Sequence, residues 1–334
     1  MRSKKIFLLA FHIPNSAIRI RKMAITIKNA ISNAVKLLRD SDIEAASLDA
    51  EVLLAHVLHC RRTDLYVDFD RALSEEDISN FMELVQKRIM RMPLQYITGH
   101  SEFMSLDFIV NKSVLIPRPE TEFVVESVIR KANLFATANL PQARLDAQKT
   151  LNIFDIGTGC GNIAVSLAVN LKNVRIYACD VSKDALSVAR TNAKRRNVSE
   201  MISFLQGDLF DAFKDLDLKG KVNFIVSNPP YVAETERAEL QPEIINHEPE
   251  LAIFGGRDGL TFYRRIFSET PDWLTPDGYL VMEMGEGQAN SIAALIRESA
   301  HFDGLEFVKD LQKIDRVLIA HVKNCKLQNA NFKF

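Results

Sequence analysis

The stretch L-N-I-F-D-I-G-T-G-C-G, Leu151 to Gly161, joins a short, mostly apolar run to three glycines at alternate positions. The run over 151–156 has the length of one strand and reads as buried on both faces. Glycine lets a backbone take positive φ and approach a ligand closely. The stretch therefore predicts a buried strand that ends in a ligand-binding loop, with a helix starting at its third glycine.

The rest of the C-terminal part continues this alternation of strands and helices. Further strand-like runs are V-R-I-Y-A-C-D, I-S-F-L-Q-G-D, F-I-V-S-N-P-P and Y-L-V-M-E-M-G, with helical segments at about 161–170, 183–196, 259–269 and 288–299. Such runs are typical of a parallel sheet flanked by helices. The last pair, L-E-F-V-K-D and R-V-L-I-A-H-V, is separated only by 311–315, too short for a parallel crossover. We therefore expect an α/β fold whose sheet ends in an antiparallel hairpin.

The N-terminal part has a different pattern. Apolar residues recur every three or four positions over 25–92, and Ser74 with Asp77 forms a capping-box variant before the third helix. This predicts a small helical bundle over residues 23–93. Residues 94–118 alternate apolar runs with Gly, Ser and Asn, which indicates a hairpin linker. Pro119 then opens a helix and the sheet domain, 119–322, with a tail at 323–334.

Residues 1–22 form an extension with six Lys or Arg, and no acidic residue precedes Asp40. A basic start followed by I-F-L-L-A-F is compatible with a targeting segment, but no A-x-A cleavage site follows it. A mis-assigned start or a disordered extension is the other interpretation. No apolar run approaches the ~20 residues that span a membrane. We expect a cytoplasmic protein, with organellar import as the alternative.

Composition narrows the classes of function. The chain has 334 residues, 47% hydrophobic and 25% charged, and its net charge of −1 provides no general basic field for nucleic acid. The four cysteines are scattered without C-x-x-C, so neither a zinc site nor a disulfide framework is indicated. His56, His59 and Cys60 lie in a helical pattern without further ligands, so we expect no metal.

The glycine loop favours a nucleoside ligand without a pyrophosphate. Its G-x-G-x-G departs from the dinucleotide pattern G-x-G-x-x-G because position 162 is Asn162. Asp180 ends the second strand about twenty residues later, where an acidic residue accepts bonds from ribose hydroxyls. Asp208 ends the next strand, near the expected adenine. With Asp155 these make three strand-end carboxylates around one loop; a single one would read as a loop cap. Cys160 is expected to fill a small position in the turn rather than act as a nucleophile.

The second motif is N-P-P-Y, Asn228 to Tyr231, at the end of the fourth strand. Ligands of open α/β sheets bind at this edge. The Asn228 carbonyl can accept one N–H of a planar nitrogen, and a carbonyl beside a proline can accept another, because proline has no N–H of its own. Tyr231 would stack on the planar group. The alternative is a Pro-Pro strand terminator with a chance asparagine.

D-x-G-x-G-x-G followed by Asp180 resembles a class I S-adenosylmethionine-dependent methyltransferase. That resemblance implies a Rossmann-like sheet of order 3-2-1-4-5-7-6 with strand 7 antiparallel. N-P-P-Y resembles the motif of methyltransferases that modify planar nitrogens, either exocyclic amines of bases or side-chain amides.

A closer resemblance covers about Met23 to Val322. P-L-Q-Y-I-T-G, I-P-R-P-E-T-E, D-I-G-T-G-C-G-N-I-A, G-D-L-F, N-P-P-Y-V and E-P-E-L-A-I-F-G-G-R-D-G-L are similar to the protein-(glutamine-N5) methyltransferases of peptide chain release factors, the HemK-type enzymes. The family implies methyl transfer to the glutamine of the GGQ motif in class 1 release factors, which the helical bundle would dock.

The resemblance also assigns roles to individual residues. It implies cofactor binding by Gly157, Thr158, Gly159, Cys160, Gly161, Asp180 and Asn228, with Asp208 and Leu209 flanking adenine, and substrate binding and catalysis by Asn228, Pro229, Pro230 and Tyr231. The family often carries a larger aromatic residue at the position of Leu209.

Other functions stay open on the motifs alone. A sister group methylates a glutamine of a ribosomal protein, and N-P-P-Y also occurs in nucleic-acid amino-methyltransferases, for which Lys194–Arg196 supplies a small basic patch. A non-catalytic module that kept the fold is the third alternative. We expect no membrane partner, no direct nucleic-acid partner and a monomer.

Overall fold

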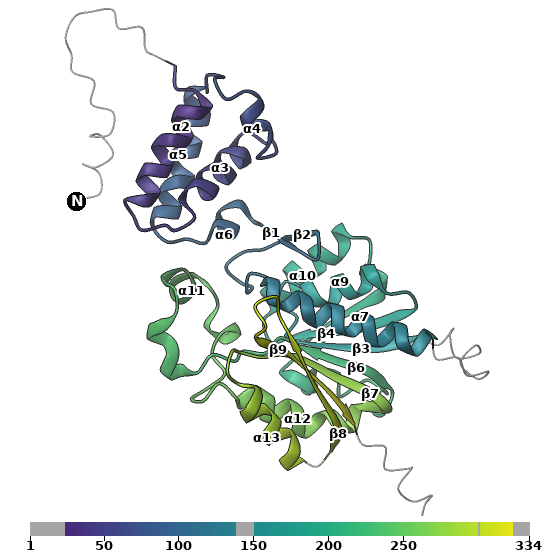
Figure 1. Ribbon diagram of the computed structural model, residues 1–334. Helices are drawn as coiled ribbons and strands as arrows, with labels where there is room; N and C mark the ends of the chain where they lie inside the picture. The colour runs from purple at the N-terminus through teal and green to yellow at the C-terminus, as the bar shows by residue number, and fades with distance from the viewer. Residues whose placement is uncertain (1–23, 138–149, 300, 323–334) are drawn as a thin grey trace, which may run out of the picture. The chain divides into compact units, whose positions relative to one another are not determined.

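The computed structural model describes residues 24–137, 150–299 and 301–322, and it divides into two compact units, residues 1–89 and 90–334 (Figure 1). The expected extension at 1–22 and the tail at 323–334 lie outside the described residues. Within the described ranges, no helix has both the length and the apolar character that crossing a bilayer requires.

The first unit is a helical bundle, as its periodicity predicts. Its helices are α2 (Ile27–Arg39), α3 (Ala46–Val57), α4 (Asp64–Val67) and α5 (Glu75–Ile89). The Ser74 hydroxyl accepts the Asp77 N–H at 3.0 Å, and the Asp77 carboxylate accepts the Ser74 N–H at 3.3 Å, which completes the expected cap of α5. Helix α4 is too short for a periodic signal. No group of three or more His, Cys, Asp or Glu among the described residues is arranged to hold a metal ion.

The second unit opens with α6 (Leu94–Thr98) and a hairpin of β1 (His100–Phe103) and β2 (Leu106–Ile109). The hairpin is more than a connector. Phe103 and Phe108 are fully buried in the core beneath the large sheet. Asn192 accepts the Ile109 N–H at 2.8 Å and donates to the Ile109 carbonyl at 3.0 Å. The hairpin therefore packs as part of the second unit.

The large sheet has the expected fold class. Its strands are β3 (Leu151–Ile156), β4 (Val174–Asp180), β5 (Ile202–Gln206), β6 (Val222–Ser227), β7 (Leu274–Glu283), β8 (Phe302–Lys309) and β9 (Asp315–Val322). Their spatial order is β5-β4-β3-β6-β7-β9-β8. The first five are parallel, and β9 runs antiparallel to both β7 and β8. Counted from β3 as strand 1, this is the order 3-2-1-4-5-7-6, so the predicted α/β class is confirmed.

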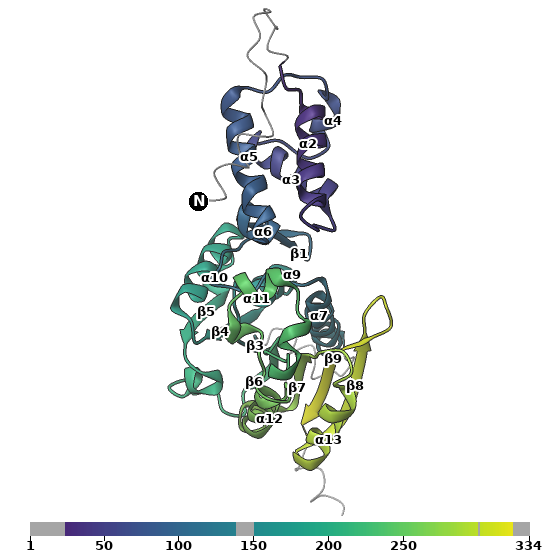
Figure 2. The ribbon, with the colours of Figure 1, turned by 90° about the vertical axis from the view of Figure 1, so that its left-hand side faces the viewer.

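Helices cover both faces of this sheet (Figures 1 and 2). One face carries α7 (Glu122–Thr137), α9 (Asn162–Asn170) and α10 (Lys183–Arg195); the other carries α12 (Thr261–Trp273) and α13 (Ala289–Ser299). Short elements complete the unit: η1 (Pro119–Thr121), η2 (Ser199–Met201), η3 (Leu209–Phe213), η4 (Glu234–Glu239), α11 (Pro242–His247) and η5 (Glu250–Ala252). Because both faces are buried, the strands are apolar runs. The polar residues predicted for the site lie at the carboxyl ends of β3, β4, β5 and β6, at one edge of the sheet.

Candidate active site

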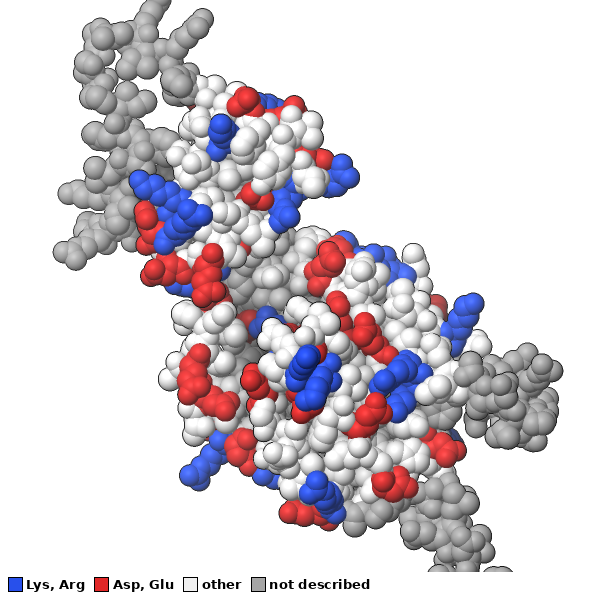
Figure 3. All heavy atoms as spheres, viewed as in Figure 1, with Lys and Arg blue, Asp and Glu red and all other residues white. Residues whose placement is uncertain are grey.

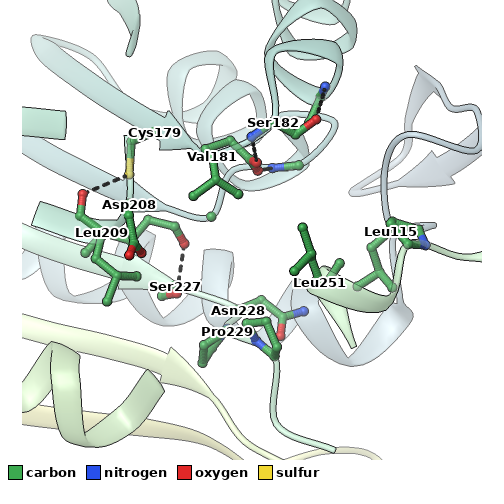
Figure 4. A pocket seen from close by; sticks show the side chains of 18 of the residues that line it. Leu115, Cys179, Val181, Ser182, Asp208, Leu209, Ser227, Asn228, Pro229 and Leu251 are labelled. Atoms are coloured by element: carbon green, nitrogen blue, oxygen red, sulfur yellow. Dashed lines mark hydrogen bonds between the residues drawn. The ribbon is translucent and has the colours of Figure 1, made fainter. Parts of the chain in front are cut away.

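A cavity of about 460 Å³ lies at the carboxyl ends of β3, β4, β5 and β6, and this is an ordinary size for a small-molecule site (Figure 4). Its lining includes eight of the twelve predicted site residues, of which six are predicted cofactor contacts: Gly157, Gly159, Asp180, Asp208, Leu209 and Asn228. Pro229 and Pro230 also line it, whereas Thr158, Cys160, Gly161 and Tyr231 do not. Figure 4 shows Asp208 and Leu209 on one side of the cavity, Leu115 and Leu251 on the other, and Asn228 between them.

The three glycines of the loop have two different functions. All three have positive φ, +73°, +54° and +82°. A Cβ added to Gly157 or Gly159 would meet no atom within 4 Å, so both leave open space beside the cavity. A Cβ on Gly161 would lie 3.1 Å from the Ala189 Cβ. The first two glycines thus leave room for a ligand, and the third lets α9 pack closely on α10.

Thr158 and Cys160 face the protein interior. The Thr158 hydroxyl donates to the Asp155 carboxylate at 2.6 Å, which ties the loop to β3. Asp155 is fully buried, and burial raises its pKa to about 7. Asp155 therefore holds the loop from the interior side and is absent from the cavity lining. Burial also raises the pKa of the Cys160 thiol to about 12, in agreement with a packing role.

Asp180 binds the loop as well as lining the cavity. Its Oδ2 accepts the Gly159 N–H and its Oδ1 accepts the Ser182 N–H, both at 2.9 Å. Burial raises the pKa of this carboxyl, and the two N–H donors oppose that effect. The Val181 N–H also bonds this carboxylate. A carboxylate has about four acceptor sites, so capacity remains for a ligand hydroxyl. The predicted ribose contact is compatible with this geometry and stays a prediction.

Beyond the end of β5, next to the end of β4 that carries Asp180, the cavity holds an ion pair that the sequence did not reveal. Arg265 of α12 lines the cavity and contacts the Asp208 carboxylate at 2.8 Å. Beside it, Leu209 has a φ of +50°, and its carbonyl accepts the Cys179 thiol at 3.5 Å. The guanidinium orients Asp208 at the position predicted for adenine. The sequence around Arg265 gave no sign of this contact, because Arg265 lies 57 residues from Asp208 in the chain.

Asn228 is half-buried directly after β6. The preceding Ser227 hydroxyl donates to the Ile156 carbonyl at 2.8 Å and fixes β6 against β3. The Asn228 Nδ2 donates to the Thr121 hydroxyl at 3.1 Å. Tyr231 turns away from the cavity lining, and its hydroxyl donates to the Glu283 carboxylate at 3.2 Å. The stacking of Tyr231 on a planar group stays a prediction.

The G-G-R-D-G-L segment supports the N-P-P-Y loop from behind. A Cβ on Gly255 would lie 2.5 Å from the Pro230 carbonyl oxygen, and one on Gly259 would overlap the Tyr231 carbonyl oxygen. Gln288 closes the contact: its Nε2 donates to the Tyr231 carbonyl, and its Oε1 accepts the Gly285 N–H, both at 2.9 Å. Only glycine allows this approach. Nothing in the sequence marked Gln288 as a functional residue. Glu283 could have been noticed, because it is a carboxylate within an apolar strand.

A buried carboxylate joins two segments at the cavity. Glu248 accepts the Arg118 guanidinium at 2.6 Å and the Ile116 N–H at 3.3 Å. The adjoining residues Leu115 and Pro249 both line the cavity. This ion pair positions I-P-R-P-E-T-E against E-P-E-L, two motifs far apart in the chain.

Comparison with known proteins identifies the family. Residues 29–99 match the model of the PrmC N-terminal domain, and residues 131–257 match the methyltransferase small domain. The release factor glutamine methyltransferase of Geobacter sulfurreducens is 37% identical over 293 residues, which cover 88% of this chain and 95% of that protein. The chain belongs to the release factor glutamine methyltransferase family.

Other members and neighbours differ in extent. The bifunctional methyltransferase of Rickettsia felis is 35% identical over 312 residues, and the chain spans 58% of its length. Among solved structures, the N-terminal domain of human METTL16 in complex with SAH matches with a TM-score of 0.46 and 16% identity, over 80% of this chain and 93% of that one. A similarity of that size carries no functional conclusion. Membership of the release factor glutamine methyltransferases rests on the sequence relatives.

Proposed function

We propose that the chain transfers a methyl group from S-adenosylmethionine to the side-chain amide nitrogen of the glutamine in the GGQ motif of class 1 release factors. The observation that carries this proposal is the setting of Asn228. Its Nδ2 is bound to Thr121, so its Oδ1 is left to accept an N–H of a substrate amide at the cavity. Family membership supports the same activity.

The residues present fit S-adenosylmethionine. Gly157 and Gly159 leave open space where a ligand backs onto the loop, Asp180 has acceptor capacity for ribose, and Asp208 with Leu209 lines the part of the cavity beyond β5. When bound, the cofactor supplies a methyl group on a cationic sulfur. The absence of the dinucleotide pattern, with Asn162 where a third glycine would fall, agrees with a nucleoside that carries no pyrophosphate.

The residues of N-P-P-Y would make the amide nitrogen reactive by position. An amide nitrogen is a weak nucleophile because its lone pair is delocalised into the carbonyl. Asn228 Oδ1 accepts one N–H, and the Pro229 carbonyl, at a residue that lines the cavity, accepts the other. Two acceptors in fixed positions hold the nitrogen in line with the methyl donor. The methylated nitrogen is acidic and loses its proton without a strong base.

The proposal also assigns a function to each segment of the chain. We assign the bundle over 23–93 to release-factor docking, the segment over 94–118 to linkage and 119–322 to catalysis, in a monomeric cytoplasmic protein; organellar import stays the alternative. A nucleic-acid substrate is less favoured. Within the patch Lys194–Arg196, Arg195 and Arg196 both donate to Asp107, and on the face in Figure 3 basic and acidic side chains are interspersed.

The direct test incubates the full chain with methyl-labelled S-adenosylmethionine and a purified release factor. Peptide mass spectrometry then locates the label. We expect one methyl group on the glutamine of the GGQ motif, and none on a release factor with alanine at that position. Label in a ribosomal protein or in ribosomal RNA, with none in the release factor, would overturn the proposal.

The support of the N-P-P-Y loop gives a second test. Gly255→Ala places a methyl group 2.5 Å from the Pro230 carbonyl, so the loop must shift, and we expect transfer to fall by about tenfold or more. Gly304→Ala is the matched control, because its nearest neighbour would be the His321 Cβ at an ordinary 3.5 Å. Initial rates at saturating cofactor measure both. Equal rates in the two variants would contradict a positioning function for Gly255.

A further inference from the structure

Asn228, which lines the cavity, and three side chains behind it form one continuous set of hydrogen bonds. Asn228 Nδ2 donates to Thr121 Oγ1 at 3.1 Å, and Thr121 Oγ1 donates to Glu283 Oε2 at 2.5 Å. Tyr231 donates to the other oxygen, Glu283 Oε1, at 3.2 Å. Thr121 and Glu283 are each only 1% exposed, so water does not replace these partners.

The direction of these bonds is determined by Glu283. An ionised carboxylate only accepts hydrogen bonds. The single proton of the Thr121 hydroxyl must therefore point to Glu283, and Thr121 can offer only a lone pair to Asn228. Asn228 must then present its Nδ2 to Thr121. Its carbonyl oxygen is left for the cavity, where the proposed substrate needs an acceptor.

We propose that Glu283, acting through Thr121, is a positioning residue that sets which end of the Asn228 amide faces the substrate. The inference rests on the proposed function, since it concerns how the same site receives an N–H group. Neither residue touches the reacting atoms. We call the bonds from Asn228 through Thr121 to Glu283 the relay. Without the relay, the Asn228 amide could rotate by half a turn. It would then present N–H donors to a substrate amide that also presents donors.

Protonation of Glu283 would reverse the relay. Burial raises the pKa of Glu283 to about 7, while the donors Thr121 and Tyr231 oppose that shift. The charged groups around it are Glu120, which raises its pKa, and Arg316 of β9, which lowers it; Tyr263 of α12 donates to its backbone carbonyl at 2.8 Å. Burial raises the pKa of the Tyr231 phenol, which keeps that residue a donor. Protonated Glu283 would donate to Thr121, and Thr121 would then donate to residue 228.

A charge swap tests the direction of the relay. In Glu283→Gln, the new amide oxygen still accepts from Tyr231, and the new N–H₂ donates to Thr121. The Thr121 hydroxyl proton then points to residue 228, where it needs an acceptor. Asn228 meets that requirement only by turning its N–H₂ to the cavity. Asn228→Asp alone places a carboxylate against a hydroxyl that has no proton to give. In the double variant, Thr121 donates to the introduced carboxylate, and the second oxygen of that carboxylate faces the cavity as an acceptor.

The expected kinetics follow from these bond directions. Each single variant should lose about tenfold or more in kcat for release-factor methylation, the effect of one misplaced buried donor or acceptor. The kcat of the double variant should exceed that of each single variant by about fivefold or more. Independent effects would instead make the double variant slower than either single variant. Calorimetry with S-adenosylmethionine and thermal unfolding confirm that each variant binds the cofactor and is folded.

The pH profile gives a readout that loss of structure would not produce. Wild-type kcat should rise with pH through about 7, because ionised Glu283 holds the productive orientation. Asn228→Asp should show the opposite slope, since protonated Glu283 lets Thr121 donate to the introduced carboxylate. The Glu283→Gln variants should lack this step. Thr121→Ser should stay within about threefold of wild type, and Thr121→Val should fall by about tenfold and lose the step.

The outcomes separate this inference from the proposed function. A wild-type protein that leaves the release factor unmethylated contradicts the proposed function itself. A wild-type protein that methylates it, combined with a double variant no better than the worse single, overturns the relay and leaves the function standing. Parallel pH slopes in wild type and Asn228→Asp, or equal rates in Thr121→Ser and Thr121→Val, overturn it in the same way.

Discussion

Alanine at position 228 is expected to lower kcat for methyl transfer by about a hundredfold or more while changing the dissociation constant of S-adenosylmethionine by about threefold or less. In the proposed function Asn228 supplies the acceptor that orients the substrate amide, while most of the cavity lining belongs to other residues. Single-turnover kinetics with labelled cofactor measure the first quantity, and calorimetry measures the second.

Asn223→Ala is the matched control for this variant. Asn223 lies on the same strand, β6, toward its opposite end, where it accepts the Asn152 N–H at 2.9 Å. It is remote from the cavity lining, so kcat should stay within about twofold of wild type. Full activity in Asn228→Ala would refute the role assigned to this residue.

Removal of the Asp180 carboxylate should act on cofactor affinity instead. Asp180→Ala loses the acceptor of the Gly159 and Ser182 N–H groups together with the proposed acceptor of the ribose. Bonds to a charged group contribute about 1.5–3 kcal/mol each, so affinity should fall by about a hundredfold or more. Calorimetric titration with S-adenosylmethionine measures the change.

Asp184 provides the comparison for Asp180. It is exposed, yet it lines the same cavity, so Asp184→Ala removes a nearby negative charge without removing the bonds to the loop. We expect its affinity for S-adenosylmethionine to stay within about threefold of wild type, as screening of an exposed charge implies. Similar losses in both variants would indicate a general charge effect and contradict a specific contact.

The fold was predictable because its signals are local. Buried parallel strands such as β3 appear as apolar runs, and the glycines of the loop announce its conformation one residue at a time. The short distance between β8 and β9 excludes a parallel crossover on length alone. The N-terminal helices follow from their periodicity and the Ser74 cap. None of these inferences required knowledge of which segments meet in space.

The support of the site was not predictable, because its partners meet only through the topology. Thr121 and Asn228 are 107 residues apart, and Thr121 and Glu283 are 162 apart. Asp155 was expected only as one of three strand-end carboxylates around the loop. Strand alternation alone does not say which face a loop will cover, and the structure turns Asp155 into the core. The packing of the β1–β2 hairpin was hidden for the same reason.

The buried Glu283 also makes folding depend on pH. Its carboxyl has an ordinary pKa near 4.5, and burial raises the folded value to about 7. Between these values the folded chain binds a proton that the unfolded chain releases, so this group contributes stability in acid that is lost as pH rises through 7. Asp155 adds to the same trend, from 3.8 to about 7. Folding therefore disfavours the ionised form of Glu283, which is the form proposed to orient Asn228. At a pH where Glu283 is ionised, the free energy of unfolding is lower than in acid.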